Sequence, residues 1–160
     1  NYTEIFGLDV EQSLVLHLNG WGKGVIKGNL ETGEGIRENS VDCFICTQTI
    51  QFIYDVHSAV RNIYRSLKPG GVALVTANCL GQLSLYDYHN WGEYWRFTDQ
   101  SMRKLFAEVF ADHNIIVQSW GNIKTAIAYL YGLCAEDLKE EDFAFQDEQY
   151  PVIVTAVVRK

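Results

Sequence analysis

The sequence has little that would mark a membrane-spanning, secreted or nucleic-acid-binding protein. No apolar stretch reaches the ~18 residues that a membrane helix needs, and no signal-peptide pattern is present, so neither a span nor export is indicated. The net charge is −7, whereas binding to a phosphate backbone needs clustered lysine and arginine. We therefore expect a cytoplasmic protein without a membrane or nucleic-acid partner.

Cysteine is also scarce, and its spacing argues against a metal site. Cys43 and Cys46 lie three residues apart within a predicted strand, where such residues point to opposite faces and cannot jointly bind one zinc ion. No second pair of this spacing and no neighbouring pair of histidines is present. We interpret both, together with Cys79 and Cys134, as buried free thiols in a reducing cytosol, and we predict no metal site.

A glycine-rich nucleotide loop that opens a helix is missing as well. Residues 20–24 read Gly-Trp-Gly-Lys-Gly after an apolar strand, but residues 25–28 predict another strand instead of a helix that would face a ligand. A parallel crossover needs about a dozen residues, so we expect a hairpin or a loop here. The lack of this motif disfavours a nucleotide-dependent oxidoreductase.

What the chain does contain is enough apolar sequence for one globular domain. Its 160 residues are 48% hydrophobic and 21% charged, which fits a single domain over residues 1–160. Helical periodicity predicts helices in residues 53–67, 98–110 and 125–133, with Thr98 as the N-cap of the second. Apolar runs predict strands at residues 13–19, 25–30, 42–46, 72–76, 115–118 and 151–158. Strands interleaved with helices indicate an α/β fold with a Rossmann-like open sheet and flanking helices.

The most informative segment runs from Asp42 to Asn78 and predicts one βαβ crossover. Its two strands are apolar at every position, so we expect both faces of their sheet to be covered. The turn Lys68-Pro69-Gly70-Gly71 separates the helix from the second strand, with Gly70 free to adopt a positive φ at the helix end. Ligands bind at the carboxyl ends of strands in open α/β sheets, and Thr47, Gln48 and Asn78 stand at those ends.

Two segments resemble class I methyltransferases that depend on S-adenosyl-L-methionine (SAM), in particular the methyltransferase type 11-like group. The first contains Asp-Cys-Phe-Ile-Cys-Thr-Gln-Thr at residues 42–49 and Leu-Lys-Pro-Gly-Gly-Val-Ala-Leu-Val at residues 67–75. The second, Trp-Gly-Glu-Tyr-Trp-Arg-Phe-Thr at residues 91–98, is similar to a subgroup associated with polysaccharide biosynthesis. The resemblance implies a mostly parallel sheet with an antiparallel C-terminal strand, and SAM as cofactor.

The sequence departs from the family pattern near its start. The family's first strand and its glycine-rich SAM loop have no counterpart, so the resemblance implies an N-terminally truncated fold. Neighbouring strands would then pair with each other, or another chain would fill the place.

The resemblance also implies a cofactor site made largely of amides. Asn19 stands where an acidic residue usually binds the ribose hydroxyls, and Asn29 replaces the aspartate of the usual Gly-Asp-Leu. Asn29 and Leu30 would border the adenine, and Asn29 can still accept a hydrogen bond from the adenine amino group through its carbonyl oxygen. Thr47 and Gln48 would line the methionine end. Each of these residues could instead be a polar strand end that satisfies loop backbone.

The acceptor would lie against the aromatic segment. Trp91, Tyr94 and Trp95 could pack against sugar rings or a sulfonium cation, and Arg96 could bind a phosphate or carboxylate. The alternative is a structural lid in which Arg96 pairs with Glu93 or Asp99. His89 is the best-placed general base, although a single loop histidine is more often a surface residue.

The resulting hypothesis is a SAM-dependent methyltransferase that acts on a small molecule, with a sugar or glycan precursor as the favoured acceptor. The alternative is a catalytically inactive methyltransferase-like module with a binding or regulatory role. Whether the chain forms a homo-oligomer stays open.

Overall fold

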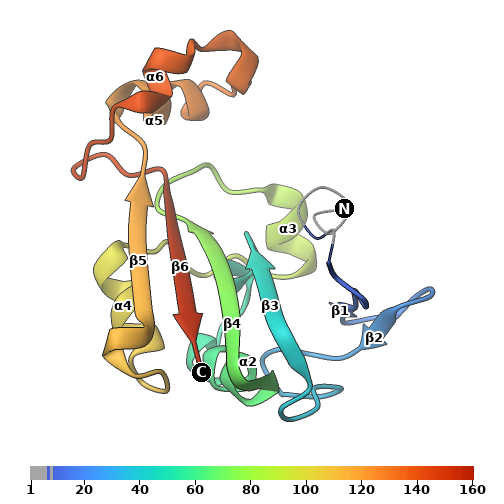
Figure 1. Ribbon diagram of the computed structural model, residues 1–160. Helices are drawn as coiled ribbons and strands as arrows, with labels where there is room; N and C mark the ends of the chain where they lie inside the picture. Colours follow the sequence, from blue (N-terminus) through green and yellow to red (C-terminus); the bar gives the residue numbers. More distant parts are fainter. Residues whose placement is uncertain (1–6, 8) are drawn as a thin grey trace.

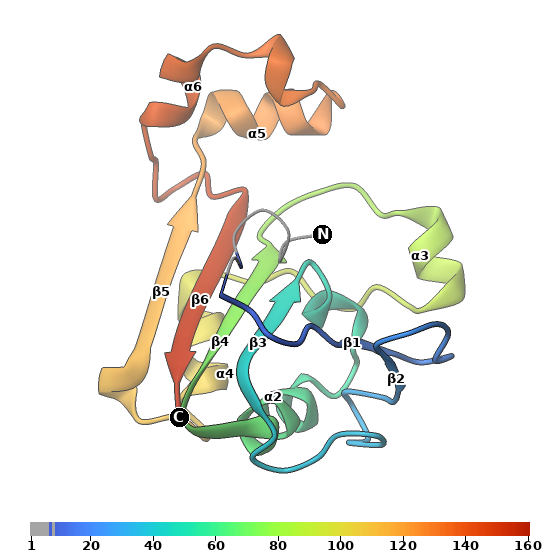
Figure 2. The same ribbon diagram turned by 45° about the vertical axis from the view of Figure 1, so that its right-hand side comes forward.

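The computed structural model describes residues 7 and 9–160 as an α/β fold (Figures 1 and 2). The sequence predicted that the family's first strand and glycine-rich loop have no counterpart at the start of the chain, and this prediction concerns residues outside the described range. Within the described residues, no helix has the length and apolar character that crossing a membrane requires. The strands are β1 Val15–His17, β2 Val25–Lys27, β3 Val41–Thr47, β4 Leu67–Asn78, β5 Ile115–Trp120 and β6 Ile153–Arg159. The α-helices are α2 Val56–Ser66, α3 Leu85–Asn90, α4 Asp99–Phe106, α5 Ile123–Leu130 and α6 Glu140–Ala144, joined by the 3₁₀ turns η1 Ile50–Phe52, η2 Asp112–Asn114 and η3 Ala135–Asp137.

The main sheet has four strands in the order β3-β4-β6-β5. β3 pairs with β4 in parallel, and β6 runs antiparallel to both of its neighbours. β3, β4 and β5 therefore share one direction, while the C-terminal strand alone is reversed. This arrangement confirms the predicted Rossmann-like, mostly parallel sheet with an antiparallel last strand.

Helix α2 forms where the apolar spacing predicted it. Asp55 caps its start, with Oδ1 accepting a hydrogen bond from the Ser58 backbone N–H at 2.9 Å. Val56, Val60 and Ile63 are buried along one face. The helix ends at Ser66, and the expected turn at residues 68–71 belongs to an irregular start of β4, where the register to β3 shifts. Gly70 does have a positive φ of 80°, but within this irregular segment and not as the helix cap.

Helix α4 packs on the same face of the sheet as α2 (Figure 1). Thr98 caps it as predicted, in a reciprocal arrangement with Ser101. Met102, Leu105 and Phe106 are buried against the sheet residues of this face. The sheet contributes Cys46, Ala73, Val75, Ala77, Ile115, Val154, Ala156 and Val158 to the same core.

The opposite face of the sheet is open among the described residues, so the expectation of two covered faces is wrong there. A row of cross-strand neighbours runs over all four strands, Ile45↔Leu74↔Val157↔Ile116. Their side chains are 45%, 38%, 40% and 58% exposed, respectively. The reason is that α2 and α4, which supply the helical cover of this sheet, both lie on the other face.

Strands β1 and β2 form a separate two-stranded sheet. They pair in parallel, so the expected hairpin is wrong and the loop interpretation of residues 20–24 is confirmed. Gly20, Gly22 and Gly24 all adopt positive φ, which lets a short connection turn back without a helix. His17 is exposed, because its neighbour Leu16 is the residue of β1 that packs against the core and successive strand residues point to opposite sides.

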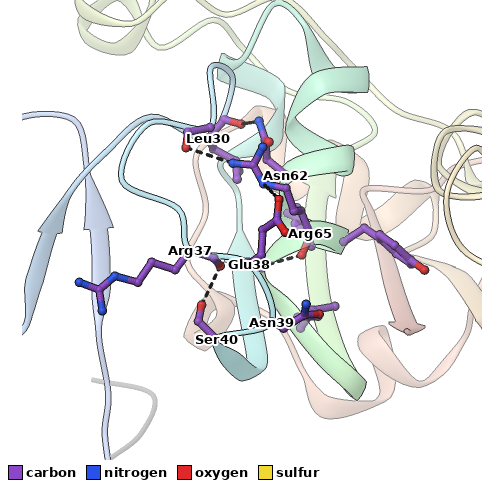
Figure 3. Close-up of polar contacts among 12 residues, drawn as sticks. Leu30, Arg37, Glu38, Asn39, Ser40, Asn62 and Arg65 are labelled. Atoms are coloured by element: carbon purple, nitrogen blue, oxygen red, sulfur yellow. Dashed lines mark hydrogen bonds and ion pairs between the residues drawn. The ribbon is translucent and has the colours of Figure 1, made fainter.

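The loop after β2 is fastened to helix α2 (Figure 3). Buried Asn62 donates from Nδ2 to the carbonyl oxygens of Leu30 at 2.9 Å and Glu31 at 3.2 Å. Farther along, the backbone N–H of Asn39 donates to the Arg65 carbonyl. These contacts join the β1–β2 unit to the main body, and the Leu30 carbonyl, which is buried, finds its partner in Asn62.

Helices α5 and α6 lie beyond the carboxyl end of β5 (Figures 1 and 2). Helix α5 starts at Ile123, two residues ahead of the predicted start, and Asn122 caps it. Asn122 Nδ2 also donates to the carbonyl oxygens of Asp142 and Phe145. The acidic stretch 136–148 contains α6 and its flanking turns. That all these elements form one domain over residues 1–160 stays a prediction.

The last residue stabilises the carboxyl end of α2. Lys160 Nζ donates to the carbonyl oxygens of Tyr64 at 3.0 Å and Leu67 at 2.9 Å, and to Asn39 Oδ1 at 2.9 Å. The ammonium also lies 4.5 Å from the centroid of the Tyr64 ring. A positive charge at this end complements the partial negative charge of the helix dipole.

We expect Lys160→Met to lower the free energy of unfolding by about 2 kcal/mol, because it removes a charge that serves several acceptors at a helix terminus. Urea denaturation followed by circular dichroism measures the change. Lys23→Met, in the exposed loop after β1, is the matched control and should change stability by less than about 0.5 kcal/mol. Equal stabilities of the two variants would contradict the capping role.

Candidate functional site

The candidate site begins at the carboxyl ends of β3 and β4, as the sequence predicted. Gln48 follows β3, and its backbone N–H donates to the Thr76 carbonyl at 2.9 Å and to Thr76 Oγ1 at 3.2 Å. Its φ of +49° is left-handed, which is uncommon for a residue other than glycine. Backbone held in this region is frequent at ligand sites, since surrounding contacts must maintain it.

A chain of side-chain hydrogen bonds connects these strand ends. Gln48 Nε2 donates to Thr76 Oγ1 at 3.3 Å, and Gln51 Nε2 donates to Gln48 Oε1 at 3.3 Å. Gln51 is 1% exposed, and within the described residues its Oε1 has no hydrogen-bond partner. Gln51 was missed in the sequence, because a polar residue in a short apolar turn has no periodic signal.

The aromatic segment lies across this turn. The backbone N–H groups of Tyr94 and Trp95 both donate to the Gln51 carbonyl, at 2.9 and 3.3 Å. Trp95 Nε1 donates to the Ile53 carbonyl at 3.0 Å, and the Phe97 N–H donates to the Asn78 carbonyl at 3.0 Å. The segment is therefore held against both strand ends by its own backbone.

Three exposed aromatic rings form a continuous surface here. The Tyr54 ring centroid lies 5.3 Å from that of Tyr94, edge to face, and 6.3 Å from that of Trp95, stacked. All three side chains are exposed. Tyr54 was missed in the sequence because it precedes the helix and lies outside its apolar stripe. Such a surface can pack against a sugar ring or a cation.

Arg96 is engaged within the protein. Its Nη2 lies 2.6 Å from Glu93 Oε1, and the Glu93 side chain is only 3% exposed. Arg96 also donates to the carbonyls of Trp95 and Gln82. This is the Glu93 pairing that the sequence allowed, and it leaves the guanidinium fewer free donors for a bound anion.

His89 and Trp91 belong to helix α3 and its end. His89 is exposed, and its ring centroid lies 5.4 Å from that of Tyr88. Within the described part of the chain, no ion pair or side-chain hydrogen bond orients the imidazole, so its role as a base stays a prediction. Trp91 caps the carboxyl end of α3 and is also exposed.

The predicted adenine and ribose residues lie on the separate β1–β2 unit. Asn19 is exposed beyond β1, and its backbone N–H donates to His17 Nδ1 at 3.1 Å. Asn29 Oδ1 accepts from the backbone N–H of Glu31 at 2.8 Å and of Thr32 at 3.4 Å, so this oxygen is already used in a turn. Leu30 is buried in the main core. The two walls of the site thus belong to different sheets.

The cysteines are free thiols in the structure, but the prediction that they are buried is wrong for Cys43 and Cys134, which are exposed. Cys43 is exposed and Cys46 is buried, as opposite faces of β3 require. No group of histidine, cysteine, aspartate or glutamate suited to a metal occurs among residues 7 and 9–160. Burial raises the pKa of the Cys46 thiol to about 12 and that of Cys79 to about 11.

We expect Cys46 and Cys79 to resist alkylation in the folded protein, since a raised pKa leaves very little thiolate at pH 8 and thiolate is the reactive form. Mass spectrometry of peptides after iodoacetamide treatment should show exposed Cys134 modified at least tenfold faster. In urea all four cysteines should react alike, which controls for peptide recovery. Rapid modification of Cys46 without urea would contradict its burial.

Comparison with known proteins shows that part of the chain is similar to one family. Residues 1–75, just under half of the 160-residue chain, match a family model described as a methyltransferase domain. No curated protein matches the sequence.

Solved structures share the fold at low sequence identity. A protein from Thermotoga maritima, described as a SAM-dependent methyltransferase and possible histamine N-methyltransferase, is 18% identical with a TM-score of 0.55. The match covers 85% of this chain but only 63% of that protein, less than two thirds of its length. A SAM-dependent methyltransferase from Mesorhizobium loti is 12% identical with a TM-score of 0.55, covering 93% of this chain and 80% of that one. One from Archaeoglobus fulgidus is 12% identical with a TM-score of 0.53, covering 86% and 67%. At these identities the likeness establishes the fold.

Proposed function

We propose that the protein is a SAM-dependent methyltransferase that acts on a small molecule. The observation that carries the proposal is a polar site at the ends of β3 and β4, on a sheet whose reversed last strand lies between β4 and β5. The match of residues 1–75 to a methyltransferase domain supports SAM as the cofactor.

The residues present offer a partial set of partners for SAM. Asn19 would bind the ribose hydroxyls, and Thr47 and Gln48 would line the methionine end. Asn29 and Leu30 would border the adenine. Because Asn29 Oδ1 already accepts two backbone hydrogen bonds, its Nδ2 is the group left to donate to an adenine ring nitrogen. Asn19 and Asn29 are amides at positions where the family usually has carboxylates, so their hydrogen bonds to the cofactor would lack the added strength of a charge.

Bound SAM supplies an electrophilic methyl group, and the protein's part is to position the acceptor and exclude water. The Tyr54, Tyr94 and Trp95 rings would hold a flat or cyclic acceptor, for which a sugar or glycan precursor is our candidate. Trp91 would extend this surface, while Arg96 would keep the segment in place and contact the acceptor at its edge. His89 would take the proton from an acceptor hydroxyl.

The second candidate is an inactive methyltransferase-like module with a binding or regulatory role. It is favoured by the separation of β1–β2 from the main sheet, which leaves the two walls of the cofactor site without strand pairing between them among the described residues. Cofactor binding decides between the two candidates. Cytoplasmic localisation and a homo-oligomeric state remain predictions.

We expect S-adenosylhomocysteine to bind the chain and raise its Tm, because a ligand that binds only the folded state stabilises it by mass action. Isothermal titration calorimetry and a thermal shift at millimolar ligand measure this. Adenosine triphosphate at the same concentration is the control for non-specific purine binding. Absence of both heat and shift would favour the inactive module.

We expect Asn29→Ala to weaken S-adenosylhomocysteine binding by about 1 kcal/mol, roughly fivefold, because one hydrogen bond to the adenine is lost. The same titration measures it, with circular dichroism to verify folding. Asn114→Ala, at the opposite end of the sheet before β5, is the control. An affinity within experimental error of the wild type would remove Asn29 from the site.

A further inference from the structure

Gln51 has a buried side-chain oxygen that accepts no hydrogen bond from the described part of the chain. Its side chain is 99% removed from solvent, yet within the described residues Oε1 has no hydrogen-bond partner. A buried carbonyl oxygen without a donor costs about 1–3 kcal/mol, so native structures rarely keep one without a reason. The site around it is the one at the ends of β3 and β4.

The direction of the neighbouring hydrogen bonds fixes which atom is left over. Gln48 Nε2 donates to Thr76 Oγ1, which leaves Gln48 Oε1 to accept from Gln51 Nε2. Turning the Gln51 amide over would place its oxygen against the Gln48 oxygen, where the two acceptors repel. With Gln48 and Thr76 in this arrangement, Gln51 presents a carbonyl oxygen, which only a hydrogen-bond donor can satisfy.

We propose that Gln51 Oε1 accepts a hydrogen bond from the α-ammonium group of the bound cofactor. This inference rests on the proposed methyltransferase function and adds a binding residue to its site. Gln51 is connected to Gln48, the residue proposed at the methionine end, by a 3.3 Å hydrogen bond. An ammonium carries three donors and no acceptor, which complements a lone carbonyl oxygen.

Other groups of the cofactor fit the position less well. The carboxylate has only acceptors and would be repelled, and the sulfonium has no hydrogen-bond donor. The ribose hydroxyls and the adenine belong to the β1–β2 side, near Asn19 and Asn29. The Tyr94 and Trp95 backbone covers Gln51 from solvent, so a hydrogen bond to a charged donor formed there is stronger than one on the surface.

Two ligands separate the amino-acid part of the cofactor, which carries the ammonium, from the adenosine part. S-adenosylhomocysteine has the amino-acid part, and 5′-methylthioadenosine lacks it. By calorimetry, Gln51→Met should weaken S-adenosylhomocysteine binding about tenfold and leave 5′-methylthioadenosine affinity within twofold. Gln100→Met, at an exposed position in the first turn of α4, should change neither. Equal weakening of both ligands, or of neither, would overturn the proposal.

The stability of the free protein provides a second readout. If Oε1 is unsatisfied without ligand, Gln51→Met removes a buried polar atom that has no partner and should raise Tm by about 2–4 °C. The variant also removes the donor to Gln48 Oε1, but Gln48 is half-buried and can accept from water instead. A lower Tm would mean that Oε1 already bonds a buried water, and would overturn the proposal whatever the cofactor does. If the wild type binds neither ligand, the proposed function itself fails. If it binds S-adenosylhomocysteine and Gln51→Met binds equally, only the role of Gln51 fails.

Discussion

The position of β6 between β4 and β5 is the constraint on which the rest of the structure depends. Both edges of this strand are hydrogen-bonded, so it joins the β3–α2–β4 crossover to the later α4–β5 segment. Val154, Ala156 and Val158 complete the core under α2 and α4. The sheet therefore requires pairing between β4 and β6, which are separated by about half of the chain, and formation of the two halves is coupled to the pairing of β6.

The position of the candidate site follows from this sheet, and its chemistry follows from the residues at the carboxyl ends of β3 and β4. Parallel β3 and β4 bring Gln48 and Asn78 to one side, and the aromatic segment is fastened there by backbone hydrogen bonds to Gln51 and Asn78. Recognition by amides differs from recognition by carboxylates, because an amide both donates and accepts and has no charge to lose between pH 5 and 9. Protonation of these side chains would then contribute nothing to the pH dependence of cofactor affinity.

The sequence predicted what local patterns control. Helical spacing placed α2, Thr98 was identified as the cap of α4, and the strand ends at Thr47 and Gln48 followed from the crossover. It could not predict the open sheet face, because Ile45 and Leu74 have the composition of covered strand residues and only tertiary packing exposes them. Tyr54 and Gln51 were missed for a related reason: their importance comes from contacts with residues 94 and 95, about 40 positions away.

The open face and the free outer edge of β3 have a practical consequence. Among the described residues β3 has a partner on one side only, and its exposed face is apolar. An extended segment of any chain can pair with such an edge, and apolar side chains retain it. Copies of this protein are thus expected to associate as the concentration rises. The properties of the single chain are therefore observed at the lowest workable concentration.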